Sequence, residues 1–202
     1  MTATANRRWI EYSAEWLEWS QRNLLAAVRA TSPANLRLRP GPRAPSIAFH
    51  AWHMARWADR YQSSMPAWLG EEPVTGPEGP VTGPEAEIWF RDDVVGRLGL
   101  AAIETGDYGG TGAGLDDEAS AALPLPDAPE LLAYMEAAFG AFEGRVRAIA
   151  DDAALDIAIV DLYGEDSTIA DAIAGATSHA DRHLGMIEAL RGILGDHGTV
   201  TV

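Results

Sequence analysis

Residues 167–195 read STIADAIAGATSHADRHLGMIEALRGILG, and this stretch is typical of one long amphipathic helix. Thr168 and Asp171 have the spacing of a capping box, so we expect the helix to begin near Ser167 or Thr168. Gly195 stands just after the last apolar position and predicts the end of the helix. The same apolar spacing can be looked for in the rest of the chain to find further helices.

His179 and His183 lie one helical turn apart within this stretch. At about 100° per residue, both fall on the same side of the helix as its apolar positions. That side also carries Ala172, Ala176, Ile187, Leu190 and Leu194. A buried imidazole costs free energy unless it is hydrogen-bonded or ligated, so the pair needs a partner inside the protein.

A second helical stretch, SIAFHAWHMARWADRYQSS at residues 46–64, carries His50 and His53 on its own buried side. Two histidine pairs would then point into one interior. Helical bundles commonly build metal sites from side chains on facing helices, and imidazole suits zinc, nickel, copper or iron. The segment HADRH lacks the glutamate of the HExxH motif, which excludes a zinc protease of that kind.

Two further helices are expected, from about residue 6 to 30 and from residue 127 to about 150. Between the second and third helices, prolines and glycines dominate residues 70–127, with a short helix expected near 86–103. The predicted fold is therefore all-α. We expect a single domain over residues 1–202, an antiparallel four-helix bundle with a Pro/Gly-rich insertion between the second and third long helices.

Two other segments invite functional interpretations. The glycine-rich stretch ETGDYGGTGAGLDDE at residues 104–118 matches neither GxGxxG nor GxxxxGK, so we expect a flexible loop there and not a phosphate site. The stretch LDIAIVDLYG at residues 155–164 alternates like a strand. Because no second strand is evident to pair with it, we interpret it as an extended link.

The composition excludes several classes of function. The 202 residues include 15 basic and 30 acidic side chains, a net charge of −15, which argues against a nucleic-acid partner. The absence of cysteine excludes disulfides, thiolate metal ligands and a cysteine nucleophile. No apolar run is long enough to cross a membrane, and the first residues are charged where a signal peptide would be apolar. We therefore expect a cytoplasmic protein with no membrane partner.

The segments SIAFHAWHMARWAD, residues 46–59, and SHADRHLGMIEALRGILG, residues 178–195, resemble the DinB-like superfamily of four-helix-bundle proteins. The resemblance implies a metal site with one histidine from the second helix and an HxxxH pair from the last. In this sequence the implied ligands are His53, His179 and His183. His50 departs from the family pattern, and it could replace His53, add a fourth ligand or act as a base behind the ligands.

Three histidine ligands leave a coordination position open, as in catalytic metal sites. A metal there, with zinc or nickel favoured, would activate either a bound water for hydrolysis or an external thiol. The resemblance implies a transferase or isomerase that uses a low-molecular-weight thiol such as mycothiol, bacillithiol or glutathione. We name His50 and Arg56 as candidate catalytic residues, with Arg56 orienting an anionic substrate. The alternative for Arg56 and Asp59 is an exposed or interhelical ion pair.

Two alternatives to an enzyme remain open. One is a non-catalytic bundle protein, stress-related in its role, that binds a metal or a small ligand. The other is a structural dimer whose histidines are satisfied by hydrogen bonds alone. For an enzyme or a binding protein we expect a small molecule as partner, and the tryptophan-rich first helix is a candidate surface for a homodimer.

Overall fold

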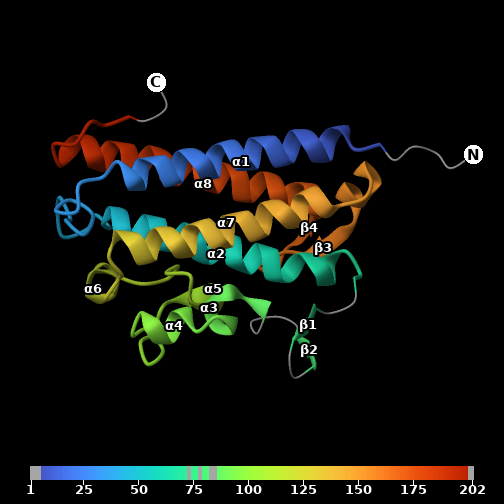
Figure 1. The fold of residues 1–202 in the computed structure, drawn as a ribbon, viewed down its shortest axis with the longest axis horizontal. Coiled ribbons are helices and arrows are strands. Elements are labelled where there is room, and N and C mark those ends of the chain that lie inside the picture. Colours follow the sequence, from blue (N-terminus) through green and yellow to red (C-terminus); the bar gives the residue numbers. More distant parts are fainter. Residues whose placement is uncertain (1–5, 72–73, 77–78, 82–85, 200–202) are drawn as a thin grey trace, which may run out of the picture.

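Four long helices dominate the computed structural model, which describes residues 6–71, 74–76, 79–81 and 86–199 (Figure 1). Their bounds are α1 (Arg8–Arg29), α2 (Ile47–Trp68), α7 (Ala128–Ala148) and α8 (Ile169–Ile193). Both α1 and α2 pack against α7 and α8, so the four helices form one bundle. The all-α prediction is confirmed, and each long helix lies where the sequence pattern places it.

The four long helices run in two opposite directions along the bundle. Figure 1 shows α1 and α8 running one way along the bundle, while α2 and α7 run the other way. Polar contacts at the helix ends agree with this arrangement. The backbone N–H of Ser32, after α1, donates to Asp196, after α8, at 3.1 Å, and Arg37, before α2, pairs with Asp127, before α7, at 2.6 Å. The bundle is thus antiparallel between its two pairs, and a long crossover lets α2 and α7 run in the same direction.

The crossover from α2 to α7 lies along the outer side of this helix pair (Figure 1). It contains the antiparallel strands β1 (Val74–Gly76) and β2 (Gly79–Val81) and four short helices. The helices are α3 (Ile88–Arg91), α4 (Val94–Arg97), α5 (Asp107–Gly110) and α6 (Asp117–Ala122). A short helix was expected near residues 86–103, and the structure has two there, α3 and α4.

The connection from α7 to α8 contains a 3₁₀ helix (Asp152–Asp156) and a small hairpin. Its strands β3 (Ala158–Val160) and β4 (Asp166–Thr168) pair antiparallel, so the interpretation of residues 155–164 as an unpaired link is wrong. The partner strand was hidden because its last residue, Thr168, is also the N-cap of α8. The predicted capping box is confirmed, because the Thr168 hydroxyl accepts from the Asp171 N–H at 3.1 Å and the Asp171 carboxylate accepts from the Thr168 N–H at 3.2 Å.

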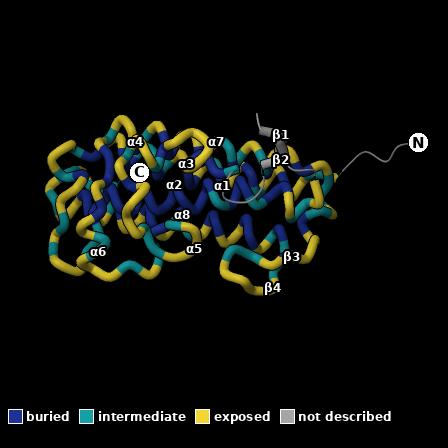
Figure 2. Tube along the Cα trace, turned by 90° about the horizontal axis from the view of Figure 1, so that it is seen from below, coloured by how far each residue is buried: buried dark blue, intermediate teal, exposed yellow. Residues whose placement is uncertain are grey.

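Helix α2 is the most enclosed element, with 18 of its 22 residues buried. The other long helices cover one side of α2 and the crossover covers the opposite side, so buried residues run along the middle of the molecule (Figure 2). Polar side chains of α2 therefore lie in the interior and must find partners there. Among the described residues, no helix combines the length and apolar character needed to cross a bilayer.

Candidate metal centre

The four predicted histidines of α2 and α8 lie together where these two helices pack. His50, His53 and His183 are buried, with 6%, 8% and 8% of their surface exposed, and His179 is half-buried. The positions three and four residues apart place each pair on one helix face, as expected from the sequence. The site is thus formed by two helices that are distant in sequence, and its more open side is that of His179.

His53, His179 and His183 form a group that can hold a metal ion. One ring nitrogen of each lies within 4.8 Å of the other two, and the Nε2 atoms of His53 and His179 are 3.4 Å apart. A tetrahedral zinc ion with Zn–N distances near 2.0–2.1 Å requires its ligand nitrogens to be about 3.3–3.4 Å apart. The His53–His179 separation matches this value and the His183 nitrogen lies within 4.8 Å of both, so the three imidazoles could hold one small divalent cation.

The orientation of the His53 ring is fixed by a backbone carbonyl. Its Nδ1 atom lies 2.6 Å from the carbonyl oxygen of Thr111 in the crossover, so Nδ1 carries the proton and donates. The Nε2 atom is then the unprotonated nitrogen, and it faces His179. Metal-binding histidines commonly donate their second ring N–H to a carbonyl or carboxylate in this way.

His50 contacts another histidine and lies outside the group of three. Its Nδ1 atom is 2.9 Å from the Nδ1 atom of His183, and the two rings are in edge contact with centroids 5.0 Å apart. One of these nitrogens must donate and the other accept. If His183 donates, its Nε2 atom is left free for a ligand role, and His50 supports that ring from behind.

Burial keeps all four rings neutral. It lowers the pKa of His50, His53 and His179 to about 4 and the pKa of His183 to about 2. Repulsion between neighbouring rings lowers the pKa of His50, His179 and His183 further, whereas the hydrogen bond to Thr111 partly offsets the effect of burial on His53. Neutral imidazole is the form that binds a metal, so protons compete weakly for these nitrogens near neutral pH.

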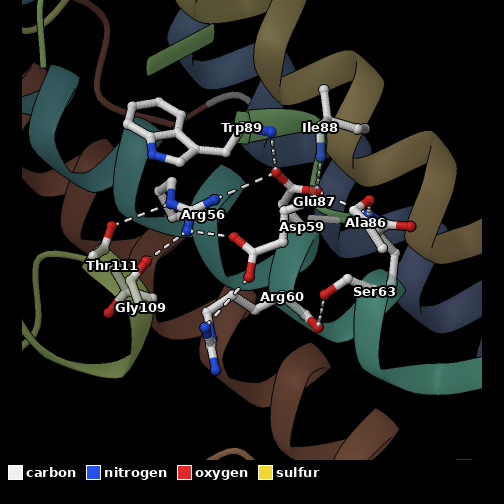
Figure 3. Close-up of polar contacts among 12 residues, drawn as sticks. Arg56, Asp59, Arg60, Ser63, Ala86, Glu87, Ile88, Trp89, Gly109 and Thr111 are labelled. Carbon is white, nitrogen blue, oxygen red and sulfur yellow. Dashed lines mark hydrogen bonds and ion pairs between the residues drawn. The ribbon is translucent and has the colours of Figure 1, made fainter. Parts of the chain in front are cut away.

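Arg56, the other residue predicted to be catalytic, is fully buried one turn from His53. Figure 3 shows it at the centre of a network of polar contacts. Its guanidinium donates to Glu87 at 2.6 Å, to the Tyr134 hydroxyl at 3.1 Å and to Asp59 at 3.3 Å. The expected exposed or interhelical ion pair is replaced by a buried network, in which Arg56 pairs with Asp59 within α2 and with Glu87 of the crossover.

Asp59 and Glu87 extend this network into the crossover. The two carboxylate oxygens of Asp59 accept the backbone N–H groups of Ile88 and Trp89, each at 2.9 Å, at the start of α3 (Figure 3). The Arg56 guanidinium also lies 4.8 Å from the centre of the Trp89 ring, at cation–π distance. The network therefore fastens α3 to α2.

Arg56 also holds the loop that carries Thr111. It donates to the carbonyl oxygen of Gly109 at 2.7 Å (Figure 3) and to that of Gly110 at 3.1 Å. Two residues further on, Gly112 has φ +90° and lies so close to α2 that a Cβ atom would come within 2.8 Å of Trp52. Only glycine fits this position, and the loop is thereby pressed against α2 with the Thr111 carbonyl beside His53.

Aromatic residues line the side of the site near His179. The Trp57 ring lies 5.8 Å from His179, 5.6 Å from Tyr108 and 5.1 Å from Tyr163, measured between ring centres. Tyr108 comes from the crossover loop, and Tyr163 comes from the turn of the β3–β4 hairpin. The two tyrosines are 5.2 Å apart and partly exposed, so two loops distant in sequence meet beside the histidines.

The expectation of a flexible loop at residues 104–118 missed the contacts that link this loop to the site. Thr111 contributes a backbone carbonyl, which any residue type can supply, and its side chain therefore gave no signal. Glu87 and the two tyrosines become relevant only once the crossover and the hairpin are placed. The one available signal was the density of glycines, of which Gly106, Gly109 and Gly112 all have positive φ.

Comparison with known proteins agrees with this fold. The sequence model of the DinB superfamily matches residues 17–187. A crystal structure described as a conserved protein from Enterococcus faecalis is similar with a TM-score of 0.68 and 18% sequence identity, covering 96% of this chain and 97% of that chain. This likeness concerns the fold alone. No curated protein matches the chain.

Proposed function

Because the chain belongs to the DinB superfamily, we propose that it is a metal-dependent enzyme whose divalent ion is held by His53, His179 and His183. The observation that carries this proposal is the convergence of three neutral ring nitrogens within 4.8 Å. Zinc and nickel suit an all-imidazole site. The substrate is a small molecule, because the net charge of −15 disfavours polyanions.

The reaction we propose is transfer or isomerisation with a low-molecular-weight thiol as cosubstrate, with hydrolysis as the alternative. When bound, the metal would lower the pKa of a thiol or a water at its open position. The chain has no cysteine, so a reacting thiol must come from solution. Access on the half-buried side of His179 supports a site that a small molecule can reach.

The protein's own residues would prepare this site. His53 donates its Nδ1 proton to Thr111 and presents Nε2 to the ion. His50 would accept from Nδ1 of His183 and so direct the other nitrogen of that ring to the ion. We assign Arg56 a positioning role, supported by the occupation of its guanidinium by Glu87 and the loop carbonyls.

A homodimer through α1 remains a proposal. Its outer face exposes a row of aromatic side chains, with 39–59% of each surface accessible: Trp9, Tyr12, Trp16 and Trp19. Exposed apolar surface of this kind is typical of association sites. Sedimentation velocity over a range of concentrations measures the oligomeric state directly.

The test of the function is metal analysis of untagged protein, together with His53→Ala and His183→Ala variants. We expect about one equivalent of zinc or nickel in the wild type and strong loss in both variants. Unchanged metal content in both variants would refute the site. A site that binds metal but never consumes thiol with an electrophilic substrate would instead favour the non-catalytic binding protein.

A further inference from the structure

Arg182 stands out among the basic residues because it is exposed beside the metal centre and unpaired. It lies on α8 between the candidate ligands, three residues after His179 and one before His183. Within the described part of the chain, no hydrogen bond or ion pair engages its guanidinium, although the protein has twice as many acidic as basic residues. An arginine that forms no ion pair at such a place is available to an anionic ligand.

The position of Arg182 relative to the site is defined by its neighbours. Residues three apart on a helix are surface neighbours, which places Arg182 beside His179, the most accessible ring of the three. Its positive charge is among the causes that lower the pKa of both His179 and His183, after burial and the neighbouring rings. Burial, Asp161 and Tyr108 raise the pKa of the Tyr163 hydroxyl, and the charge of Arg182 acts in the opposite direction, so Arg182 and Tyr163 lie on the same side of the centre.

Tyr108 and Tyr163 provide an apolar wall next to this charge. The two rings are in edge contact at 5.2 Å, with 40% and 47% of their surfaces exposed, and both cover Trp57 beside His179. Tyr108 has φ +52°, a left-handed conformation that is unusual for a tyrosine. Strained positions of this kind cluster at binding sites, where the surrounding structure holds them in place.

The backbone around Tyr108 supplies that support. The N–H of Asp107 donates to the carbonyl of Ala113 at 2.7 Å, and the N–H of Gly112 donates to the carbonyl of Thr105 at 2.7 Å. These two bonds close the loop at its base, and Tyr108 lies at its tip. The loop thus fixes an exposed ring above Trp57.

We propose that Arg182, Tyr108 and Tyr163 form a recognition site for a thiol that carries a carboxylate, with Arg182 pairing with the carboxylate and the two rings contacting the carbon skeleton. This inference rests on the proposed function, because it assigns the class of thiol that reaches the open side of the metal centre. Such a recognition site would bind an anionic thiol more tightly than a neutral thiol of similar size.

The experiment uses the full-length protein loaded with cobalt(II), whose visible spectrum reports a thiol entering the coordination sphere. Mercaptosuccinate serves as the anionic probe and 2-mercaptoethanol as the neutral probe. We expect Arg182→Gln to weaken the binding of mercaptosuccinate about tenfold or more, since a charge-assisted hydrogen bond contributes about 1.5–3 kcal/mol. The affinity for 2-mercaptoethanol should stay unchanged. Cobalt content is measured after each titration to show that the thiol has not removed the metal.

A matched control is Arg22→Gln, which removes the same charge from an exposed position of α1 with no described partner. It is expected to leave both affinities unchanged. A second variant, Tyr163→Ala, tests the apolar wall with 2-mercaptobenzoate as probe. We expect it to weaken the binding of this aromatic thiol about threefold and to leave the affinity for 2-mercaptoethanol unchanged.

The outcomes separate the two proposals. If neither thiol alters the cobalt spectrum of the wild type, thiol use by this centre is refuted, and the recognition site with it. If both thiols bind but Arg182→Gln affects mercaptosuccinate no more than Arg22→Gln does, the recognition site is refuted while the proposed function stands. Selective loss of the anionic thiol in Arg182→Gln supports both.

Discussion

The Nδ1 atom of His53 lies 2.6 Å from the carbonyl oxygen of Thr111, 58 residues further along the chain. This contact joins the metal centre to the crossover, because Thr111 belongs to the loop that Arg56 holds. The crossover therefore determines the orientation of the His53 ring, one of the three proposed ligands. Variants that move the loop should change metal binding even though they remove no ligand.

Gly112→Ala tests this link. A Cβ atom there would lie 2.8 Å from Trp52 and 3.0 Å from Phe49, at a φ of +90° that alanine rarely adopts. We expect a loss of about 1–3 kcal/mol in the free energy of unfolding and weaker zinc binding, measured by urea denaturation and competition with a chelator. The control is Gly140→Ala in α7, where a Cβ meets nothing within 4 Å, and it should not destabilise the protein. Wild-type zinc affinity in a folded Gly112→Ala protein would contradict the link.

Variants of His50 distinguish support of a ligand from ligation. His50→Asn keeps an acceptor oxygen near the position of Nδ1, whereas His50→Leu leaves His183 without its partner. We expect His50→Leu to weaken zinc binding about 10–100-fold and His50→Asn to retain most of the affinity. Competition with a chelator measures both affinities. His53→Ala removes a proposed ligand, so it should lower the zinc affinity more than either variant of His50. Equal losses in all three would assign His50 a ligand role.

Arg56→Met should destabilise the fold strongly. The change leaves the buried Asp59 without a cation and Glu87 with only the Arg60 ion pair at 3.3 Å, and breaking a buried ion pair typically costs about 3–5 kcal/mol in the free energy of unfolding. Urea denaturation measures the loss, and adding Glu87→Gln should recover part of it. The control is Arg147→Met, whose partly exposed ion pairs contribute about 0–1 kcal/mol. A small effect of Arg56→Met would show that the network contributes little.

The metal-free protein should lose stability in acid through its histidines. The folded-state pKa is about 4 for His179 and about 2 for His183, below the ordinary value of about 6.5. Between about pH 7.5 and about pH 5 the unfolded chain therefore takes up protons that the folded chain does not, so stability falls as the pH falls.

Thermal unfolding after chelation, at about pH 7.5 and about pH 5, measures this loss. His183→Asn should reduce the difference between the two pH values. An identical pH dependence in the wild type and in His183→Asn would contradict the prediction. Comparing variants separates the effect from the titration of the many surface carboxylates.

The predictions that the structure confirms are those that rest on local sequence patterns. The long helices follow from apolar spacing and from signals such as the Thr168 capping box, and the histidine pairs follow from positions three and four apart. The partners of these residues were beyond the sequence, because Thr111 acts through its backbone and Glu87 meets Arg56 across 31 residues. The hairpin was missed because its second strand is short and merges with the start of α8.

His53 and His179 are separated by 126 positions in the chain, yet their Nε2 atoms are 3.4 Å apart. An ion bound to both would act as a reversible cross-link in a protein that has no cysteine to form a permanent one. Because the three histidines converge only in the folded chain, the ion would stabilise the fold by mass action, by about 2.7 kcal/mol when its free concentration is about 100 times its dissociation constant. The availability of metal would then set how long the folded protein survives heat or denaturant, independently of any reaction at the site.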